Sequence, residues 1–371
     1  MQNKPNLEGD AMIRRPPTVA TVQTMAAWLN RVDPGTHRRI KGLRLVTAYG
    51  LAAMLGTMPD IATGLPDSAA LSPLAGGFAL WGSVSEARTT RAESSRDLVL
   101  LSIAAAFGAA VFTLLAPMLR QVSHVGPEMM LGTGAFCVGY LRRFGITGTG
   151  VGSQIYIGQL LAYGSNLQQS DLPLIAVAAA LAAVASVIPR VLSGPAEQPP
   201  PITPLPDRVG RVGPELAMGL QAAVGALFIV VLNALVGLAE SAWAITACTY
   251  VVASSTAGTF DRVRRRIVGT MIGVPIGLAF LPLTTAAPLL VWTAAALAMV
   301  IYAMALPERY DIACGAFAFT LIVTLAVSGE HSILLLAARS WETLLGGAVG
   351  LAAATMLLPL RARSWELSRN S

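Results

Sequence analysis

The sequence predicts an all-helical, polytopic membrane protein of about twelve transmembrane helices, arranged as two parallel six-helix repeats. Three observations support this fold class: the hydropathy of the chain, the alternation of charged loops, and the similarity of its two halves. Of the 371 residues, 54% are hydrophobic and only 12% are charged, and the mean hydropathy is +0.62. These values differ from those of an ordinary soluble domain, which contains about 25% charged residues.

Apolar stretches recur along the chain at lengths that suit a bilayer. Two clear examples are LVLLSIAAAFGAAVFTLLAPML from Leu98 and LPLIAVAAALAAVASVIPRVL from Leu172. A helix needs roughly 17 to 25 predominantly apolar residues to cross the hydrocarbon core. We therefore expect about twelve crossings, of which the segment from Met129 to Leu141 has the weakest pattern.

Charged residues alternate between basic loops and loops that are acidic or nearly neutral. The acidic or neutral loops include Asp67, Asp171 and Glu240, whereas the basic loops contain Arg38, Arg39, Lys41 and Arg44; Arg88, Arg91 and Arg96; Arg142 and Arg143; Arg208 and Arg211; Arg262 to Arg266; Arg309; and Arg361 and Arg363. Because Lys and Arg favour cytoplasmic loops, the basic set predicts a multi-pass protein of the bacterial inner membrane with both termini in the cytoplasm. The net charge of +6 then reflects topology and contacts with membrane lipid, and we expect no nucleic-acid partner.

The two halves of the chain resemble each other in layout. The segment SSRDLVLLSIAAAFGAAV aligns with the segment RVRRRIVGTMIGVPIGLA, with Ser94 over Val263, so that Arg96 meets Arg265 and Gly108 meets Gly277. Six crossings per half is an even number, so both halves enter from the same side, as in parallel repeats. The expected organisation is a cytoplasmic N-terminal segment (1–42), a first repeat (43–192), a Pro-rich cytoplasmic linker (193–213), a second repeat (214–360) and a cytoplasmic tail (361–371).

Two segments of the second half carry a resemblance to a known family. DRVRRRIVGTMIGVPIG, residues 261–277, and ARSWETLLGG from Ala338 resemble the two landmarks of the fusaric acid resistance type (FUSC) membrane domain. That family includes bacterial aromatic carboxylic acid exporters, and it is distantly similar to the aluminium-activated malate transporters of plants. The resemblance implies export of small organic, aromatic carboxylate anions driven by the proton gradient. The first half carries no counterpart of the Arg/Glu pair of ARSWETLLGG.

That pair, Arg339 and Glu342, lies inside an apolar run. A central charge costs roughly 2.5 to 3.5 kcal/mol on membrane-insertion scales. The spacing of three places both side chains on one helix face, where they can form an ion pair. Two interpretations remain: a structural pair that fixes this helix against its neighbours, or a site at which Arg339 binds a substrate carboxylate and Glu342 positions it or carries a proton.

Polar residues in other expected crossings extend this candidate substrate-binding site. One helical stripe in the first half contains Tyr156, Gln159 and Tyr163, and its counterpart in the second half contains Thr320 and Thr324. Such stripes can also join helices by hydrogen bonds. Trp243, Thr246 and Tyr250 are further candidates of the same kind.

Glycines and arginines of the two landmarks have separate expected roles. The spacing of four places Gly269, Gly273 and Gly277 on one helix face, and Gly346 and Gly350 on another, which favours close helix packing. Arg265 and Arg266, in the inner basic loop, are candidates for a vestibule that concentrates anions.

Sequence motifs argue against an enzyme. The chain has no HExxH or Walker A motif, its three histidines fall in expected loops or tails, and Cys137, Cys248 and Cys314 form no CxxC. We therefore expect neither a metal site nor a cofactor. A passive anion channel and a structural or partner-recruiting membrane protein remain as alternatives, and a homodimer or a periplasmic adaptor protein is a possible partner.

Overall fold

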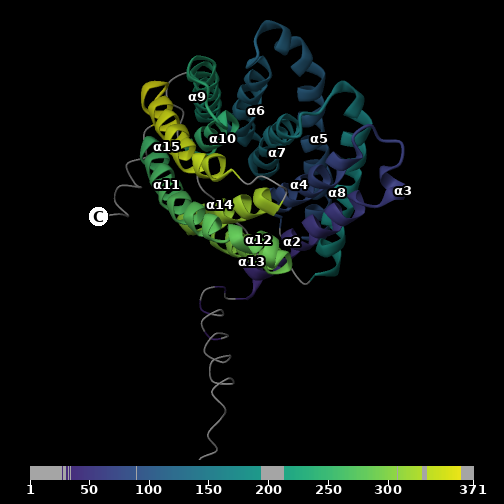
Figure 1. Cartoon of the computed structure of the whole chain (residues 1–371). Helices are drawn as coiled ribbons and strands as arrows, with labels where there is room; N and C mark the ends of the chain where they lie inside the picture. Colours follow the sequence, from purple (N-terminus) through teal and green to yellow (C-terminus); the bar gives the residue numbers. More distant parts are fainter. Residues whose placement is uncertain are drawn as a thin grey trace, which may run out of the picture. The chain divides into compact units, whose positions relative to one another are not determined.

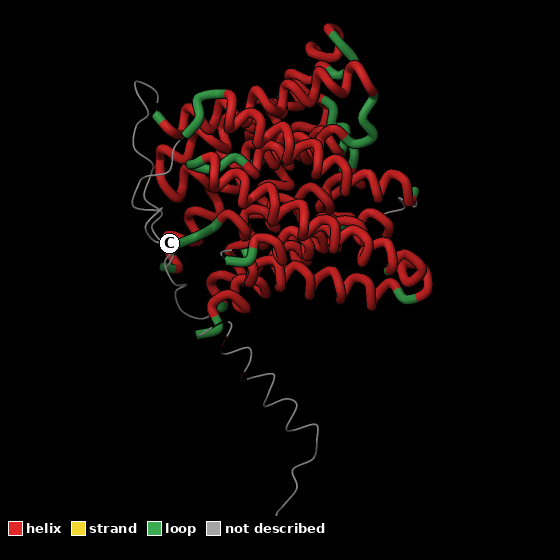
Figure 2. The backbone as a smooth tube through the Cα atoms, turned by 90° about the vertical axis from the view of Figure 1, so that its left-hand side faces the viewer, coloured by secondary structure: helices red, strands yellow, loops and turns green. Residues whose placement is uncertain are grey.

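Helices and the turns between them make up the part of the chain that the structure describes. The computed structural model describes residues 35–88, 90–193, 213–306, 308–327 and 332–360, together with residues 27, 31 and 33, and contains no strand within them (Figure 2). The chain divides into two units, Met1–His37 and Arg38–Ser371, and the account below concerns the second. Most of the expected N-terminal segment and linker, and all of the tail, lie outside the described residues.

Six helices of at least twelve residues form the first half of this unit: α2 (His37–Gly56), α4 (Ser68–Ser85), α5 (Arg91–Val122), α6 (Met129–Tyr140), α7 (Gly145–Gly164) and α8 (Leu172–Leu192). Shorter elements join them: α3 (Pro59–Ala62) and the 3-10 turns η1 (Gly126–Glu128), η2 (Leu141–Phe144) and η3 (Gln169–Asp171). The first helix therefore begins six residues before the expected start of the first repeat.

The second half contains α9 (Pro214–Val236), α10 (Ser241–Val251), α11 (Thr256–Ala279), α13 (Pro288–Ala305), α14 (Tyr310–Val327) and α15 (Ile333–Met356), with the short α12 (Leu281–Ala286) between α11 and α13. Figure 1 looks roughly along the helices and shows α7, α10 and α14 toward the middle, with the other helices around them.

Helix ends follow local capping chemistry. The side chains of Thr90, Ser255 and Ser332 each accept a hydrogen bond from a backbone N–H in the first turn of α5, α11 and α15. Gly237 ends α9 with a positive φ of 68°, a conformation that glycine adopts without the steric penalty of a Cβ.

Among the residues that the structure describes, five segments are long and apolar enough to cross a membrane: Arg91–Val122, Gln169–Leu192, Pro214–Val236, Pro288–Ala305 and Tyr310–Val327. By contrast, α6 and α10 have only 12 and 11 residues. At 1.5 Å per residue, each is roughly half as long as the ~30 Å hydrocarbon core. The chain is a helical membrane protein. Helix α6 coincides with the weakest expected crossing, Met129 to Leu141, and both α6 and α10 are shorter than the roughly 17 residues that a full crossing needs.

The predicted glycine face of α11 packs against α14. A Cβ at Gly269 would meet the carbonyl of Asp311, and one at Gly273 would meet the carbonyl of Gly315. A Cβ at Gly277 would lie 2.8 Å from the Cβ of Ile322. The two helix backbones therefore approach directly, as the small-xxx-small rule predicts. In the first half, a Cβ at Gly108 of α5 would meet the carbonyl of Ile155 of α7, and one at Gly158 of α7 would meet the carbonyl of Ala105 of α5.

The second glycine face, on α15, packs against α10. A Cβ at Gly346 would meet the carbonyl of Ala244, and one at Gly350 would lie 3.0 Å from the carbonyl oxygen of Cys248. The halves also contact each other: Gly139 of α6 meets Gly219 of α9, and Gly42 of α2 meets Val300 of α13.

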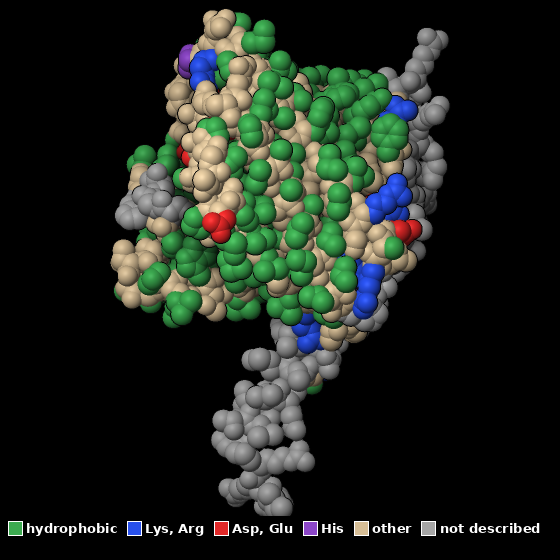
Figure 3. Space-filling view, turned by 90° about the vertical axis from the view of Figure 1, so that its right-hand side faces the viewer, with side chains coloured by type: hydrophobic (Ala, Val, Ile, Leu, Met, Phe, Trp, Pro, Cys, Tyr) green, Lys and Arg blue, Asp and Glu red, His purple; other side chains and the backbone are tan. Residues whose placement is uncertain are grey.

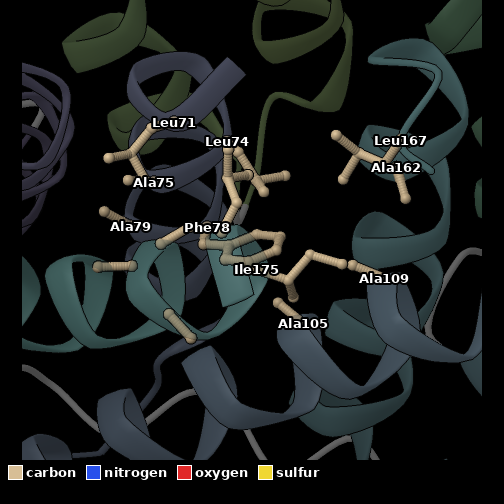
Figure 4. Close-up of a cluster of buried hydrophobic side chains, with 14 of the residues drawn as sticks. Leu71, Leu74, Ala75, Phe78, Ala79, Ala105, Ala109, Ala162, Leu167 and Ile175 are labelled. Carbon is tan, nitrogen blue, oxygen red and sulfur yellow. The ribbon is translucent and has the colours of Figure 1, made fainter. Parts of the chain in front are cut away.

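Small and large apolar side chains alternate in the buried core of the first half. Figure 4 shows Phe78 of α4 beside Ile175 of α8, with Ala105 and Ala109 of α5 close by. All four are buried, at no more than 2% exposure. The alanines allow the helices to approach, and the large side chains fill the remaining space at core density.

Large apolar side chains also cover the outside of the bundle. Ile103 and Phe107 of α5, and Val184 and Ile188 of α8, are exposed. Figure 3 shows a broad hydrophobic face, with Lys and Arg side chains gathered along one edge. A continuous apolar surface of this kind suits lipid contact, with basic side chains at one water boundary.

Candidate binding cavity

A cavity of about 980 Å³ lies between the two halves of the bundle. Its walls come from α2, α4 and α7 of the first half and from α10, α11, α13, α14 and α15 of the second. Tyr310 and Thr324, both on α14, line it. Their separation of 14 residues corresponds to about 21 Å of helix, so the cavity extends over much of the length of α14.

Arg339 of α15 lines one end of this cavity. Its side chain is only 6% exposed, and its guanidinium carbon lies 3.2 Å from the ring centroid of Trp243 on α10. Within the described ranges, Arg339 makes neither a salt bridge nor a side-chain hydrogen bond. The indole thus covers one face of the cation, a cation–π contact, while its N–H donors are left for a ligand.

Glu342 does not pair with Arg339, although their spacing permits it. Its Oε1 accepts a 2.7 Å hydrogen bond from the backbone N–H of Glu240, at the start of α10. Its Oε2 has no hydrogen-bond partner within the described residues. The side chain is fully buried and does not line the cavity, whereas Glu240 does. The ion pair allowed by the sequence is therefore replaced by two separate contacts with α10.

Aromatic rings also line the cavity. Trp81 of α4 packs edge-on against Phe317 of α14, with ring centroids 5.3 Å apart, and against Tyr302 of α13 at 6.4 Å. All three residues line the cavity. Two come from the second half and one from the first, so the aromatic wall joins the halves. Edge-to-face arrangements leave ring faces available to a planar ligand.

Four arginines line the other end of the cavity: Arg142, Arg262, Arg265 and Arg266. Arg265 forms a 2.8 Å salt bridge with Asp261. Arg266 donates to the Tyr310 hydroxyl at 3.3 Å.

Arg142 lies in η2 between α6 and α7 and forms no salt bridge with a carboxylate of the described residues. The same holds for Arg262 and Arg266. Burial and the nearby charge of Arg262 lower the pKa of Arg142 to about 10.

The structure brings some of the polar stripe residues into the cavity wall and not others. Tyr163, Thr320 and Thr324 line the cavity. Tyr156 and Gln159 do not; Tyr156 bonds Thr246 at 2.7 Å and Gln159 donates to Thr133 at 3.1 Å. These two side chains face neighbouring helices and join them. Trp243, Thr246 and Tyr250, the further candidates, all line the cavity.

Sequence reasoning missed Glu128 and Glu240, which it assigned only to outer loops. Glu128 is 6% exposed and accepts hydrogen bonds from Tyr163 of α7 at 2.8 Å, Asn233 of α9 at 2.9 Å and Ser241 of α10 at 2.8 Å. It thus connects the two halves close to the cavity wall. The only signal in the sequence was its place next to the weakest expected crossing, which is the short α6.

No group of three His, Cys, Asp or Glu residues that could hold a metal ion occurs in the described ranges. The three cysteines are free thiols, and Cys248 and Cys314 are buried. The cavity offers instead guanidinium groups at both ends with aromatic rings and hydroxyl groups between them. This arrangement can hold an organic anion without a metal ligand set.

The fold and cavity together define a multi-pass helical membrane protein with a cavity lined by both of its halves. Residues 225–353 match a family model described as fusaric acid resistance protein-like. This match confirms the resemblance to the FUSC family over the stretch that contains both landmarks, and that resemblance points to membrane transport or efflux of organic compounds. No curated protein and no solved structure matches the chain.

Proposed function

We propose that this protein exports small organic carboxylate anions, of which aromatic acids are the best fit, across the bacterial inner membrane. The observation that supports this most is the cavity between the halves, in which Arg339 has no carboxylate partner in the described residues and stacks on Trp243. A carboxylate matches the planar fork of a guanidinium. The rings of Trp81, Phe317 and Tyr302 match the apolar part of an aromatic acid.

In this proposal Arg339 binds the carboxylate and Trp243 fixes the orientation of the guanidinium. Glu342 anchors α15 to the start of α10 through the Glu240 N–H. Its second oxygen, which lacks a hydrogen-bond partner among the described residues, is where we place the uptake of a coupling proton. Proton uptake at this position would change the electrostatic potential at Arg339, which is three residues away on the same helix.

We further propose that residues 37–192 and 214–356 are two parallel six-helix repeats that together make twelve crossings. Equivalent helices make equivalent contacts, which supports this arrangement: α5 packs against α7 as α11 packs against α14, and α4 packs against α8 as α10 packs against α15. The fourth helix of each half also meets the first helix of the other, as the contacts at Gly139 and Gly42 indicate. An even number of crossings per half puts both termini on the same side of the membrane, and the basic loops favour the cytoplasm as that side.

The proposal is tested by counterflow in proteoliposomes that contain the purified protein. Unlabelled benzoate inside the vesicles should drive transient accumulation of labelled benzoate from outside, because a carrier exchanges its substrate. A passive channel would instead carry a current that reverses at the equilibrium potential of the anion. A structural membrane protein would show neither, and that result would contradict a transport function.

A pH gradient applied to the same vesicles tests the proton coupling. If a proton moves with the exchange cycle, an imposed gradient should drive net benzoate movement against its concentration. Equal rates with and without the gradient would contradict the coupling and leave the exchange activity in place.

A further inference from the structure

The end of the cavity opposite Arg339 has an unusual excess of positive charge. Arg142 from the first half meets Arg262 and Arg266 from α11 there, and all three line the cavity. The nearest carboxylates are already used: Asp261 pairs with Arg265, and Glu308 pairs with Arg38. Three guanidinium charges thus share one end of a cavity without a carboxylate partner in the described ranges.

Two of these guanidinium groups also have unused hydrogen-bond donors. The Nε atoms of Arg142 and Arg266 are buried and have no partner within the part of the chain described. A buried donor without an acceptor costs about 1 to 3 kcal/mol, more when it is charged. An anion placed between the two side chains would satisfy both donors and reduce the repulsion between the cations.

The surroundings suit a carboxylate attached to an aromatic ring. Tyr250 and Tyr310 line this end, and Tyr250 lies within electrostatic range of both Arg142 and Arg266. The Tyr250 hydroxyl shares a 2.7 Å hydrogen bond with Ser153 of α7, which keeps its ring at the boundary between the halves. Aromatic faces beside the arginines are the same combination that Trp243 provides for Arg339.

The two ends are far enough apart to be filled together. Trp243 marks the Arg339 end of α10, and Tyr250 marks the arginine cluster. Seven residues of helix separate them, or about 10 Å. The cavity volume of about 980 Å³ leaves room for one aromatic ring with its carboxylate at each end.

We propose that Arg142, Arg262 and Arg266 form a second carboxylate-binding site, which is occupied at the same time as the Arg339 site. This inference rests on the proposed transport function, and it adds that the pathway holds two substrate anions in sequence. The site at the arginine cluster receives an anion from the basic side of the bundle, and the Arg339 site holds it next.

The number of bound anions tests this inference. The full-length protein in lipid nanodiscs is titrated with 4-fluorobenzoate, and binding is followed by ¹⁹F NMR and by calorimetry. The wild type should bind two molecules per chain. Arg142→Gln combined with Arg266→Gln should bind one, and so should Arg339→Gln, because each variant keeps the other site.

Arg264→Gln is the matched control, because Arg264 is an exposed arginine of the same helix that does not line the cavity. It should retain two bound molecules. If the double variant does not fold, Arg262→Gln serves instead, since among the described residues the side chain of Arg262 donates only to the Val252 carbonyl. The affinity of the Arg262→Gln variant for 4-fluorobenzoate at the second site should fall by about tenfold to a hundredfold, which corresponds to the loss of a charge-assisted hydrogen bond.

One molecule per wild-type chain, unaffected by the Arg142 and Arg266 changes, would overturn the second site and leave the Arg339 site standing. One molecule that is lost in either variant would also overturn it, because a single ligand would then span both ends. Absence of any binding or counterflow by the wild type would contradict the proposed function itself.

Discussion

Gly273→Leu is expected to prevent accumulation of folded protein in the membrane. At this position α11 lies directly against the backbone of Gly315 on α14, and a Cβ alone would meet its carbonyl group. Adding methylene groups to a filled core costs typically 1 to 3 kcal/mol. The cost here should be at the upper end or beyond, because the obstacle is backbone and cannot change rotamer.

The measurement is the yield and thermal unfolding of detergent-solubilised protein, followed by size-exclusion fluorescence. Gly50→Leu provides the control, since a Cβ at Gly50 of α2 would meet nothing within 4 Å. The control should retain wild-type yield and stability. Equal stability of the two variants would show that α11 and α14 are not in direct backbone contact.

Arg339→Gln is expected to give folded protein that no longer transports benzoate at low concentration. Glutamine keeps much of the side-chain volume beside Trp243 but removes the charge. A charge-assisted hydrogen bond contributes about 1.5 to 3 kcal/mol, so affinity for a carboxylate should fall by about tenfold to a hundredfold. Arg339→Lys should recover part of this loss, because it restores the charge without the planar fork.

Substitution of Glu342 distinguishes a binding role of Arg339 from a structural ion pair between the two residues. Its Oε1 accepts from the Glu240 backbone N–H and not from Arg339, and glutamine can still accept that hydrogen bond. Glu342→Gln should therefore keep benzoate affinity near the wild-type value and change only the response to a pH gradient. If Arg339→Leu with Glu342→Leu recovered full transport, Arg339 would have no role in binding.

The sequence predicted those features that depend on local spacing. Glycines at intervals of four predicted the contact faces of α11 and α15, because a helix places such residues on one side whatever its neighbour. Basic residues in alternate loops are consistent with the edge of Lys and Arg side chains seen on the bundle. Arg265 and Arg266, which the sequence made candidates for a vestibule, line the cavity; their role toward anions stays a prediction.

Features that depend on distant partners could not be predicted. A spacing of three permits contact between Arg339 and Glu342, but residues of α10, about a hundred positions earlier in the chain, provide the actual contacts. The stripe of Tyr156, Gln159 and Tyr163 shows the same limit. Only Tyr163 reaches the cavity, because the first two face Thr246 and Thr133 of other helices.

Helix length was the other feature that the sequence left open. Val252 and Ala253 follow α10 directly, so hydropathy does not mark the end of that helix at Val251. Glu128 and Arg142, by contrast, limit α6 to about the length expected from the sequence. In the structure α6 ends in a 3-10 turn at Leu141, and α10 ends at Val251, where the chain turns toward α11. These two ends lie beside Arg142 and Arg262, so the shortened helices help to place the arginine cluster.

The central claim is that carboxylates pass between the two halves. Its most direct test is whether a cysteine placed in the cavity can be modified during transport. Thr320 lines the cavity between its two ends, and Thr320→Cys would be introduced after Cys137, Cys248 and Cys314 are replaced by alanine. We predict that a methanethiosulfonate reagent modifies this cysteine and stops benzoate counterflow, and that excess benzoate slows the modification. Full counterflow after complete modification would contradict a pathway through this cavity.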